Sequence, residues 1–338
     1  MEAIFLEASM ANCIKCAAEL PDEANFCPKC GFPVGTLKIC RSCQECGASL
    51  SAIDKFCSQC GKPVRVVKSA DENPFIDKSS KSANNAIPKM ISIEGGQFLM
   101  GGAAANYPVT LSSFKLSETP ITQKQYTYVT GQNPSKLKGE DKPVEMVNWC
   151  EAIIYCNVLS TIQKLTPCYS IGSVTDLRTF DANSPVWKRI ACNFSANGYR
   201  LPTEAEWEFA ARGGKQCDPY QFAGSSDINK VAWYGENSDI TTHIVGTKEP
   251  NSLCLFDMCG NVMEWCWDYF APDFPTTAQY NPRGPSIGDL HIKRGGSWLD
   301  DHQQCTVFFR SASAPAGKSS SLGFRICQSE FKTNGEQK

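Results

Sequence analysis

The stretch GYRLPTEAEWEFAARGG, residues 198–214, carries the start and stop signals of a helix. Thr203 is followed three residues later by Glu206, which makes a Thr-x-x-Glu capping box in which each side chain binds the other residue's backbone N–H. Gly213 and Gly214 provide the stop, because glycine readily adopts the left-handed conformation that ends helices. We therefore predict a helix that begins after Thr203 and ends at the glycine pair.

Two more helix signatures and several short strand-like runs surround this stretch. One helix is expected after Thr122 and ends at Gly131. Another begins after Asn148, with Glu151 closing a capping box, and its apolar residues recur at near-helical spacing: Trp149, Ile153, Cys156 and Leu159. Strands are expected at residues 90–93, 97–100, 109–116, 290–294 and 323–326. Few helices, many short strands and long loops predict an α+β domain.

Eight cysteines near the N-terminus form two copies of one pattern. Each copy has two Cys-x-x-Cys pairs, and a phenylalanine, Phe26 or Phe56, directly precedes the second pair. Four thiolates in two such knuckles complete the tetrahedral shell that Zn²⁺ accepts in closed structural sites. We predict two small zinc ribbons with the ligands Cys13, Cys16, Cys27, Cys30, Cys43, Cys46, Cys57 and Cys60.

The alternative for these cysteines is a disulfide framework, which requires an oxidising compartment. Residues 1–8 are apolar but carry Glu2 and Glu7, and they lack the basic start and the cleavage site of a secretory signal. The expected location is therefore the cytoplasm. Met10 lies just before the first ribbon and is an alternative start of the chain.

The rest of the sequence divides into a linker and one large domain. Residues 67–88 are polar and irregular, as in a flexible linker. They separate a double zinc ribbon at 10–66 from a domain at 89–331 that is long enough to bury one core. The apolar runs fall short of the ~20 residues that a membrane-spanning helix needs.

The charge pattern bears on the partners of the ribbons. The net charge of the chain is −2, and Lys and Arg are mixed with Glu and Asp in the ribbons without a basic stripe. This pattern favours docking to a protein, or a structural role, over binding to nucleic acid. The sequence leaves the choice between docking and a structural role open.

Seven phrases in a fixed order carry a resemblance to a known family. They lie at residues 95–101, 133–135, 143–145, 198–214, 257–265, 294–298 and 322–325. Together they resemble the sulfatase-modifying-factor family, whose founding activity is that of the formylglycine-generating enzyme. The resemblance implies a loop-rich variant of the C-type lectin fold, which agrees with the α+β prediction.

The family also implies calcium. Residues 260–264 resemble a family calcium site, in which the Glu264 carboxylate and nearby carbonyl oxygens provide the hard oxygen ligands that Ca²⁺ takes. The alternative is that Asn261 and Glu264 only brace a turn. The candidate calcium ligands are Gly260, Asn261, Val262 and Glu264.

The copper chemistry of the family is in doubt here. The family enzyme converts a sulfatase cysteine to formylglycine with copper(I) held by two cysteines just after the Gly-Gly-Ser-aromatic phrase. Cys305 matches the second of these cysteines, but Asp300 stands in place of the first. A carboxylate is a hard, poor ligand for Cu(I), and His302 is so close to Cys305 that it could replace the first ligand only in a rearranged loop. The resemblance thus leaves Cys305 as a catalytic residue only if the oxidase survives.

The same C-terminal stretch resembles the variable proteins of diversity-generating retroelements. Those systems alter adenines in asparagine-type codons, which excludes Gln, Lys, Glu, Met and Trp as products. Most residues between Trp298 and Leu322 comply, whereas Gln303, Gln304 and Lys318 do not and would be fixed. The alternative is an ordinary Ser/Ala-rich loop. Our candidate ligand-binding residues, called the C-terminal face below, are Trp298, Leu299, Asp300, Asp301, His302, Phe308, Phe309, Ser311, Ser313, Ser319, Ser320 and Ser321.

Two hypotheses of function follow. As a binding module, the protein would hold a protein or another ligand on its C-terminal face, with Phe308, Phe309 and His302 as anchors, because aromatic side chains dominate such contacts. As an enzyme, it would be a copper-dependent oxidase with a copper site rebuilt around Cys305. We assign no catalytic role to the remaining histidines, His243 and His291.

Overall fold

The computed structural model describes residues 86–102, 105–181 and 183–330, together with the backbone of four residues near the N-terminus. Those four form β1 (Arg41–Ser42) and β2 (Ser49–Leu50), which pair antiparallel. The chain divides into two compact units, Met1–Asn73 and Pro74–Lys338. The eight predicted zinc ligands lie outside the described residues.

Three helices of the second unit follow the predicted signals. They are α1 (Gln123–Thr130), α2 (Trp149–Ile162) and α3 (Glu204–Ala211). Each begins with a complete capping box, in which the N-cap side chain and the third helical residue bind each other's backbone N–H. A short fourth helix, α4 (Ile228–Val231), follows. Among the described residues, no helix is long and apolar enough to cross a membrane.

Short strands and 3₁₀ turns provide the other regular structure. The strands are β3 (Met90–Ile93), β4 (Gln97–Gly102), β5 (Ala105–Thr110), β6 (Phe114–Ser117), β7 (Tyr169–Ser170), β8 (Ala191–Cys192), β9 (Tyr199–Arg200), β10 (Ala232–Trp233), β11 (Cys259–Gly260), β12 (Met263–Tyr269), β13 (Gln279–Tyr280), β14 (His291–Arg294), β15 (Arg310–Ser313), β16 (Leu322–Gly323) and β17 (Cys327–Ser329). The 3₁₀ turns are η1 (Leu177–Thr179), η2 (Pro185–Arg189) and η3 (Gly214–Gln216).

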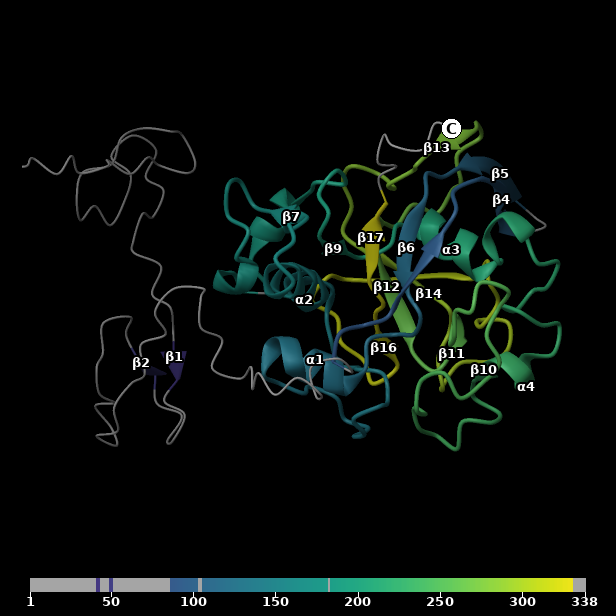
Figure 1. The fold of residues 1–338 in the computed structure, drawn as a ribbon, viewed down its shortest axis with the longest axis horizontal. Helices are drawn as coiled ribbons and strands as arrows, with labels where there is room; N and C mark the ends of the chain where they lie inside the picture. Colours follow the sequence, from purple (N-terminus) through teal and green to yellow (C-terminus); the bar gives the residue numbers. More distant parts are fainter. Residues whose placement is uncertain (1–40, 43–48, 51–85, 103–104, 182, 331–338) are drawn as a thin grey trace, which may run out of the picture. The chain divides into compact units, whose positions relative to one another are not determined.

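Two four-stranded sheets organise this unit. One has the order β15-β14-β12-β16 and the other the order β3-β6-β17-β9. In the view of Figure 1, α1 and α2 lie on one side of these strands, and α3 and α4 lie on the other. The mixture of few helices and many short strands confirms the predicted α+β class.

Two strand predictions need correction, and one strand was not predicted. Residues 109–116 are not one strand: β5 ends at Thr110 and β6 begins at Phe114. The connection between them packs closely against Gly95, where a Cβ would lie 2.3 Å from the Leu111 oxygen. Residues 323–326 do not form one strand either: β16 ends at Gly323, and residues 324–326 connect it to β17. The carbonyls of Phe324 and Ile326 in this connection accept hydrogen bonds from the amides of Ile121 and Ser117. The predicted Ser/Ala-rich loop contains β15.

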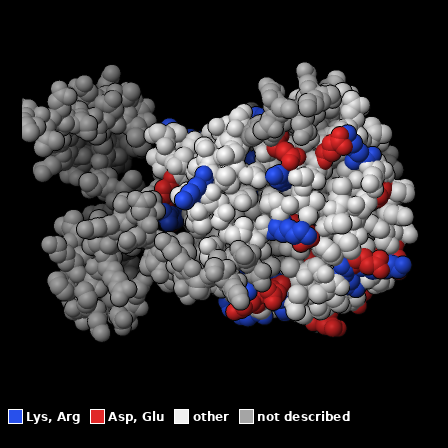
Figure 2. Space-filling view, in the orientation of Figure 1, with Lys and Arg blue, Asp and Glu red and all other residues white. Residues whose placement is uncertain are grey.

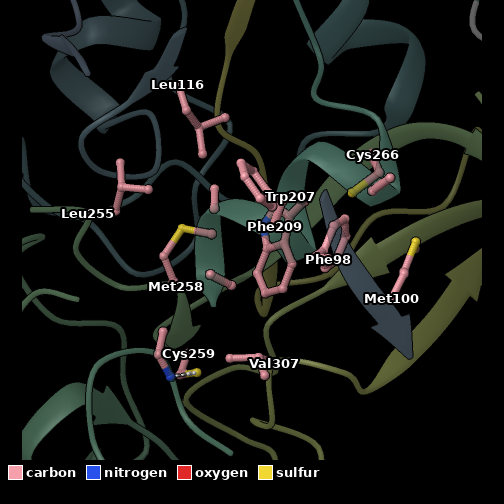
Figure 3. Close-up of a cluster of buried hydrophobic side chains, with 14 of the residues drawn as sticks. Phe98, Met100, Leu116, Trp207, Phe209, Leu255, Met258, Cys259, Cys266 and Val307 are labelled. Carbon is pink, nitrogen blue, oxygen red and sulfur yellow. Dashed lines mark hydrogen bonds between the residues drawn. The ribbon is translucent and has the colours of Figure 1, made fainter. Parts of the chain in front are cut away.

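The core is organised around α3 and α2. Trp207 and Phe209 of α3 lie among Phe98, Met258 and Val307 in one apolar cluster (Figure 3). A second cluster gathers around α2, whose predicted apolar residues Trp149, Ile153, Cys156 and Leu159 are all 0% exposed. Burial of these side chains is the main favourable term for this unit.

Candidate binding face

A buried ion pair fixes the start of α3. The Arg200 guanidinium donates two hydrogen bonds to Glu206, each 2.7 Å long. Arg200 is 2% exposed and Glu206 is 8% exposed. Because both charges are shielded from water, removing either partner would leave an uncompensated buried charge.

The other two glutamates of α3 hold the strands that carry the predicted face. Arg294 on β14 donates to Glu204 at 2.7 Å and to Glu208 at 2.6 Å. Arg310 on β15 donates to both oxygens of Glu204, at 2.6 and 2.8 Å. Arg212 donates to Glu208 at 2.9 Å. These pairs attach β14 and β15 to α3 through charge-assisted hydrogen bonds.

Glu264, a predicted calcium ligand, is bound by two other side chains. Arg325 donates to its two oxygens at 2.6 and 2.8 Å, and Trp207 Nε1 donates to Oε2 at 2.6 Å. Glu264 is 1% exposed and Arg325 is 0% exposed. We call the four buried glutamates with their arginine partners the buried frame: Glu204, Glu206, Glu208 and Glu264, with Arg200, Arg212, Arg294, Arg310 and Arg325.

The segment around Asn261 is a braced turn. Asn261 has φ 59°, and its side chain accepts from the His243 amide and donates to the His243 carbonyl, both at 3.1 Å. In the described part of the chain, no group of three or more His, Cys, Asp or Glu side chains is arranged to hold a metal ion. A calcium ion here would have to compete with Arg325 for Glu264. The side chains fit the brace, and calcium at Gly260, Asn261, Val262 and Glu264 stays a prediction.

The residues predicted for copper do not form a thiolate pair. Cys305 is 0% exposed in the core, packed so closely that a Cβ on Gly296 would lie 2.5 Å from its Sγ. Burial raises the pKa of the Cys305 thiol well above its ordinary value, so the sulfur stays protonated at neutral pH. The Asp300 carboxylate is hydrogen-bonded to the Ser297 hydroxyl. A protonated thiol and a carboxylate are poor ligands for Cu(I).

His302 does not replace the missing ligand. The Cys305 amide donates to the His302 carbonyl at 3.3 Å, so both residues lie on one turn. The His302 side chain is exposed, whereas Cys305 faces the core. Asp301 stabilises this turn by accepting from the amides of Gln303 and Gln304, at 2.8 and 3.2 Å.

Trp298 joins two stretches of the C-terminal face. Its Nε1 donates to the Ser320 carbonyl at 2.9 Å, and its own carbonyl accepts from Ser238 Oγ at 2.7 Å. The indole is only 7% exposed. The Trp298 side chain thus ties its own turn to residue 320, and its contact with a ligand stays a prediction.

The strand β15 adds a third stretch to this surface and reveals a residue that the sequence reasoning missed. Lys293 on β14 lies directly between Ser311 on β15 and Trp265 on β12, and directly opposite residues in a sheet point to the same side. Burial lowers the pKa of the half-buried Lys293 ammonium, and the nearby Asp300 carboxylate partly offsets this effect. Lys293 has no salt bridge within the described residues.

Exposure separates the predicted face residues into two groups. Leu299 is 62% exposed and Phe308 is 37% exposed, and Asp301 and His302 are exposed as well. The half-buried members are Asp300, Phe309, Ser311, Ser313, Ser319, Ser320 and Ser321. Phe309 packs against the core cluster around α2, so Phe308 is the aromatic residue with the more accessible ring.

Comparison with known proteins identifies the family of this domain. Residues 76–330 match the family described as Sulfatase-modifying factor enzyme 1-like domain. The chain belongs to the sulfatase-modifying-factor family. Residues 13–61 match the Double zinc ribbon family, which supports zinc binding by the N-terminal cysteines.

Individual relatives of this sulfatase-modifying-factor protein carry several names. The chain is 34% identical to Chaperone protein LppX of Paenibacillus barcinonensis over 74% of its own length and 93% of that protein. It is 36% identical to the Formylglycine-generating enzyme of Streptomyces coelicolor, over 41% of its own length and 49% of the enzyme. Among solved structures, Treponema denticola variable protein 1 matches with a TM-score of 0.67 and 34% identity, covering 71% of this chain and 95% of that one.

These relatives confirm the predicted fold and both resemblances. The formylglycine-generating-enzyme-like fold was predicted from the seven phrases, four of which contain residues of the buried frame, and the likeness to a variable protein was predicted from the residues between Trp298 and Leu322. The remaining histidines of this family member have structural partners: His291 stacks on Trp149 with ring centroids 3.7 Å apart, and His243 stacks on Trp233 at the same distance.

Proposed function

We propose that the protein is a binding module that presents the C-terminal face to a protein partner. One observation carries this proposal. Accessible side chains such as Leu299 and Phe308 extend from a part of the backbone that the buried frame and the Trp298 hydrogen bonds hold in place. Binding sites gain affinity when their side chains are held in place before the partner arrives. The name of LppX, a chaperone, favours a protein over a small molecule as the partner.

The likeness to Treponema denticola variable protein 1 supports diversification of this face. The backbone of the segment is bound by main-chain contacts: Met146 N donates to the Ser319 carbonyl at 3.0 Å, and Met263 N donates to the Ser321 carbonyl at 2.8 Å. Bonds of this kind survive a change of side chain. A retroelement could therefore alter these positions without altering the path of the chain.

The oxidase alternative has less support. Conversion of a sulfatase cysteine by copper and oxygen would need Cu(I) ligands at Asp300 and Cys305, and the chemistry of these two groups does not suit that ion. The two functions are distinguished by supplying Cu(I), oxygen and a peptide with the sequence Cys-x-Pro-x-Arg, where the oxidase alone would convert the peptide cysteine to an aldehyde.

The N-terminal unit complements this role. Eight cysteines in the zinc-ribbon pattern would hold two zinc ions and stabilise a segment with few apolar residues. A protein partner for the ribbons fits their mixed charge. On the side of the molecule shown in Figure 2, the described part of the chain likewise has Lys and Arg mixed with Asp and Glu. Nucleic acid is not among the partners we propose, and the cytoplasm is the proposed location.

A displayed library tests the binding proposal. The full chain is displayed with the codons of Leu299, Asp301, His302 and Phe308 randomised, and it is selected against a panel of purified folded proteins. A control library randomises exposed apolar residues outside the face, namely Val174, Tyr280 and Ile287, which are 41%, 70% and 83% exposed. We expect specific binders to arise from the first library and not from the control.

Equal recovery from the two libraries would contradict the proposal, because any exposed surface would then serve as well. Diversification has its own test in the genome. A near-copy of the coding segment for residues 298–325, beside a reverse-transcriptase gene and rich in adenine at the face codons, would support it. Absence of such a copy would remove the retroelement while leaving the binding test unaffected.

A further inference from the structure

A cavity of about 390 Å³ lies on the opposite side of β15 from Ser311 and Ser313 of the C-terminal face. Arg310 lines it, whereas its neighbour Ser311 points to the other side, because side chains alternate along a strand. The hairpin of β4 and β5, the start of α3 and residues 268–285 form the walls. The volume is near the lower end of the range for small-molecule sites, roughly 300–1,000 Å³.

Most charged groups of this cavity are already satisfied. Glu204 accepts from Arg310 at both oxygens and also from Arg294 at 2.7 Å. The remaining terminal nitrogen of Arg310 donates to the Ala271 carbonyl at 2.9 Å. Arg283 lies over the Phe194 ring, 4.0 Å from its centroid. These guanidinium groups are therefore poorly placed to receive an added anion.

Asp268 is the exception. It lines the cavity and is 4% exposed, and its Oδ2 accepts a hydrogen bond from the Glu204 amide at 2.8 Å. Within the described residues, no side-chain donor and no cation is paired with this carboxyl group. Burial raises the pKa of Asp268 well above its ordinary value, and the Glu204 charge adds to this effect. The cavity thus contains a buried carboxyl group that has a backbone donor but no cation beside it among the described residues.

The apolar part of the cavity is aromatic. Tyr107 and Phe274 have ring centroids 5.5 Å apart with an angle of 42° between their planes, and Tyr269 also lines the space. Ring faces attract organic cations when the cation lies within about 6 Å of the centroid, and Phe274 already has the Arg310 guanidinium 4.5 Å from its centroid. An anion would meet three carboxyl groups here, those of Glu204, Asp268 and Asp273.

We propose that this cavity binds a small organic ammonium ion, with its N–H group donating to Asp268 and its hydrocarbon part resting on Tyr107 and Phe274. The site is separate from the C-terminal face and does not depend on the function proposed for that face. The ammonium ion supplies the positive partner that Asp268 lacks.

Binding of such an ion is coupled to release of a proton. The bound ammonium keeps its own protons, and Asp268 loses one to the buffer as its carboxyl group becomes a carboxylate paired with the ligand. The affinity for the ammonium ion should therefore rise with pH until Asp268 is ionised in the protein without ligand. The other titratable or charged groups around Asp268 are Glu204, Glu206, Asp273, Arg283, Arg294, Arg310, Tyr107 and Tyr269.

Calorimetry with the full chain tests the proposal. The probe is phenethylammonium, and the matched probes of similar shape are 2-phenylethanol, which is neutral, and 3-phenylpropionate, which is an anion. We expect the ammonium ion to bind at least about tenfold more tightly than either matched probe. Its titration in buffers of different ionisation enthalpy should show proton release.

Two variants and one control make the test specific. Asp268→Asn keeps the acceptor for the Glu204 amide and the size of the side chain, and should weaken ammonium binding at least about tenfold and abolish its pH dependence. Ala271→Phe should fill the cavity and block binding. The control Asp289→Asn changes an acidic side chain that is 84% exposed and outside the cavity, and should leave binding unchanged.

The proposal is overturned by any of several results. These are equal binding of the alcohol and the ammonium ion, unchanged binding to Asp268→Asn, binding without proton release, or no binding of the ammonium probe at millimolar concentration. Thermal unfolding of each variant, measured in parallel, separates loss of the site from loss of the fold.

Discussion

The buried frame and the C-terminal face adjoin on two strands, where Arg294 follows Lys293 on β14 and Ser311 follows Arg310 on β15, yet the two regions use polar side chains in different ways. In the frame, Arg294 is 0% exposed and its guanidinium binds two glutamates. On the face, Lys293 next to it is half-buried with no salt bridge in the described part of the chain. Ser311 and Ser313 of the face are held in place by the backbone pairing of β14 and β15.

The difference explains how one scaffold can be both fixed and variable. Frame side chains specify one another, because a buried charge without its partner is strongly unfavourable. Ser311 and Ser313 of the face extend from a backbone that is held by strand pairing. Asp301 and Ser319, in contrast, accept hydrogen bonds from backbone amides and help to hold their turns. Substitutions in the frame should therefore lower the free energy of unfolding much more than substitutions on the face. Three measurements test this difference.

The largest effect is expected from breaking the frame at Arg325. Arg325→Met leaves the Glu264 charge buried and unpaired, and we expect the free energy of unfolding to fall by about 3–5 kcal/mol. Urea unfolding followed by tryptophan fluorescence measures this change in the second unit, because all 7 tryptophans of the chain lie there.

The matched control is Lys318→Met. Lys318 pairs with Glu151 at 2.6 Å, but the two side chains are 35% and 31% exposed. Exposed pairs contribute only about 0–1 kcal/mol, so this variant should unfold almost as the original protein does. Similar losses from the two substitutions would mean that the frame is not special.

A smaller, pH-dependent effect is expected from His291. Its ring lies between Trp149 and Tyr269, with centroid distances of 3.7 and 4.2 Å, and burial lowers its pKa to about 4. The unfolded chain binds this proton near pH 6.5, so the folded protein loses stability as the pH falls from about 6.5 towards 4. The contribution at the acid end is roughly 3 kcal/mol.

Comparison with His291→Phe isolates this contribution from other acids and bases. Phenylalanine keeps a ring between the two aromatic neighbours but cannot be protonated. Urea titration at several pH values measures the free energy of unfolding of both proteins. On acidification the protein with His291 should lose stability relative to His291→Phe. A difference that is constant with pH would show that His291 is charged or exposed in the folded protein.

Local signals in the sequence were sufficient for α1, α2 and α3, whereas the four-residue helix α4 was not predicted. Thr122, Asn148 and Thr203 each begin a helix as predicted, because a capping box is complete within a few residues of the chain. The resemblance to the family supplied the fold class that the comparisons confirm. The strand β15 was missed, because Ser and Ala have weak strand preference and the strand exists only through its pairing with β14.

The site residues show the same limit. Lys293 carried no signal of its own, since its place on the face depends on its neighbours Trp265 and Ser311 across the sheet. Trp298 entered the candidate set through its place in the C-terminal stretch, and its hydrogen bond to the Ser320 carbonyl is set by the path of the chain. Asp268 was overlooked because only the folded chain reveals that it is buried without a cation.

The smallest effect should come from the face itself and provides the sharpest test of the contrast. Leu299 is 62% exposed, whereas Leu322, at the other end of the same stretch, is 2% exposed in the core. We expect Leu299→Ser to change the free energy of unfolding by less than about 0.5 kcal/mol, while Leu322→Ser lowers it by about 2–5 kcal/mol through lost burial. Urea unfolding compares the two proteins directly. If Leu299→Ser lowered the free energy of unfolding as much as Leu322→Ser, the face would contribute to the stability of the fold. Selection for a partner would then compete with selection for stability.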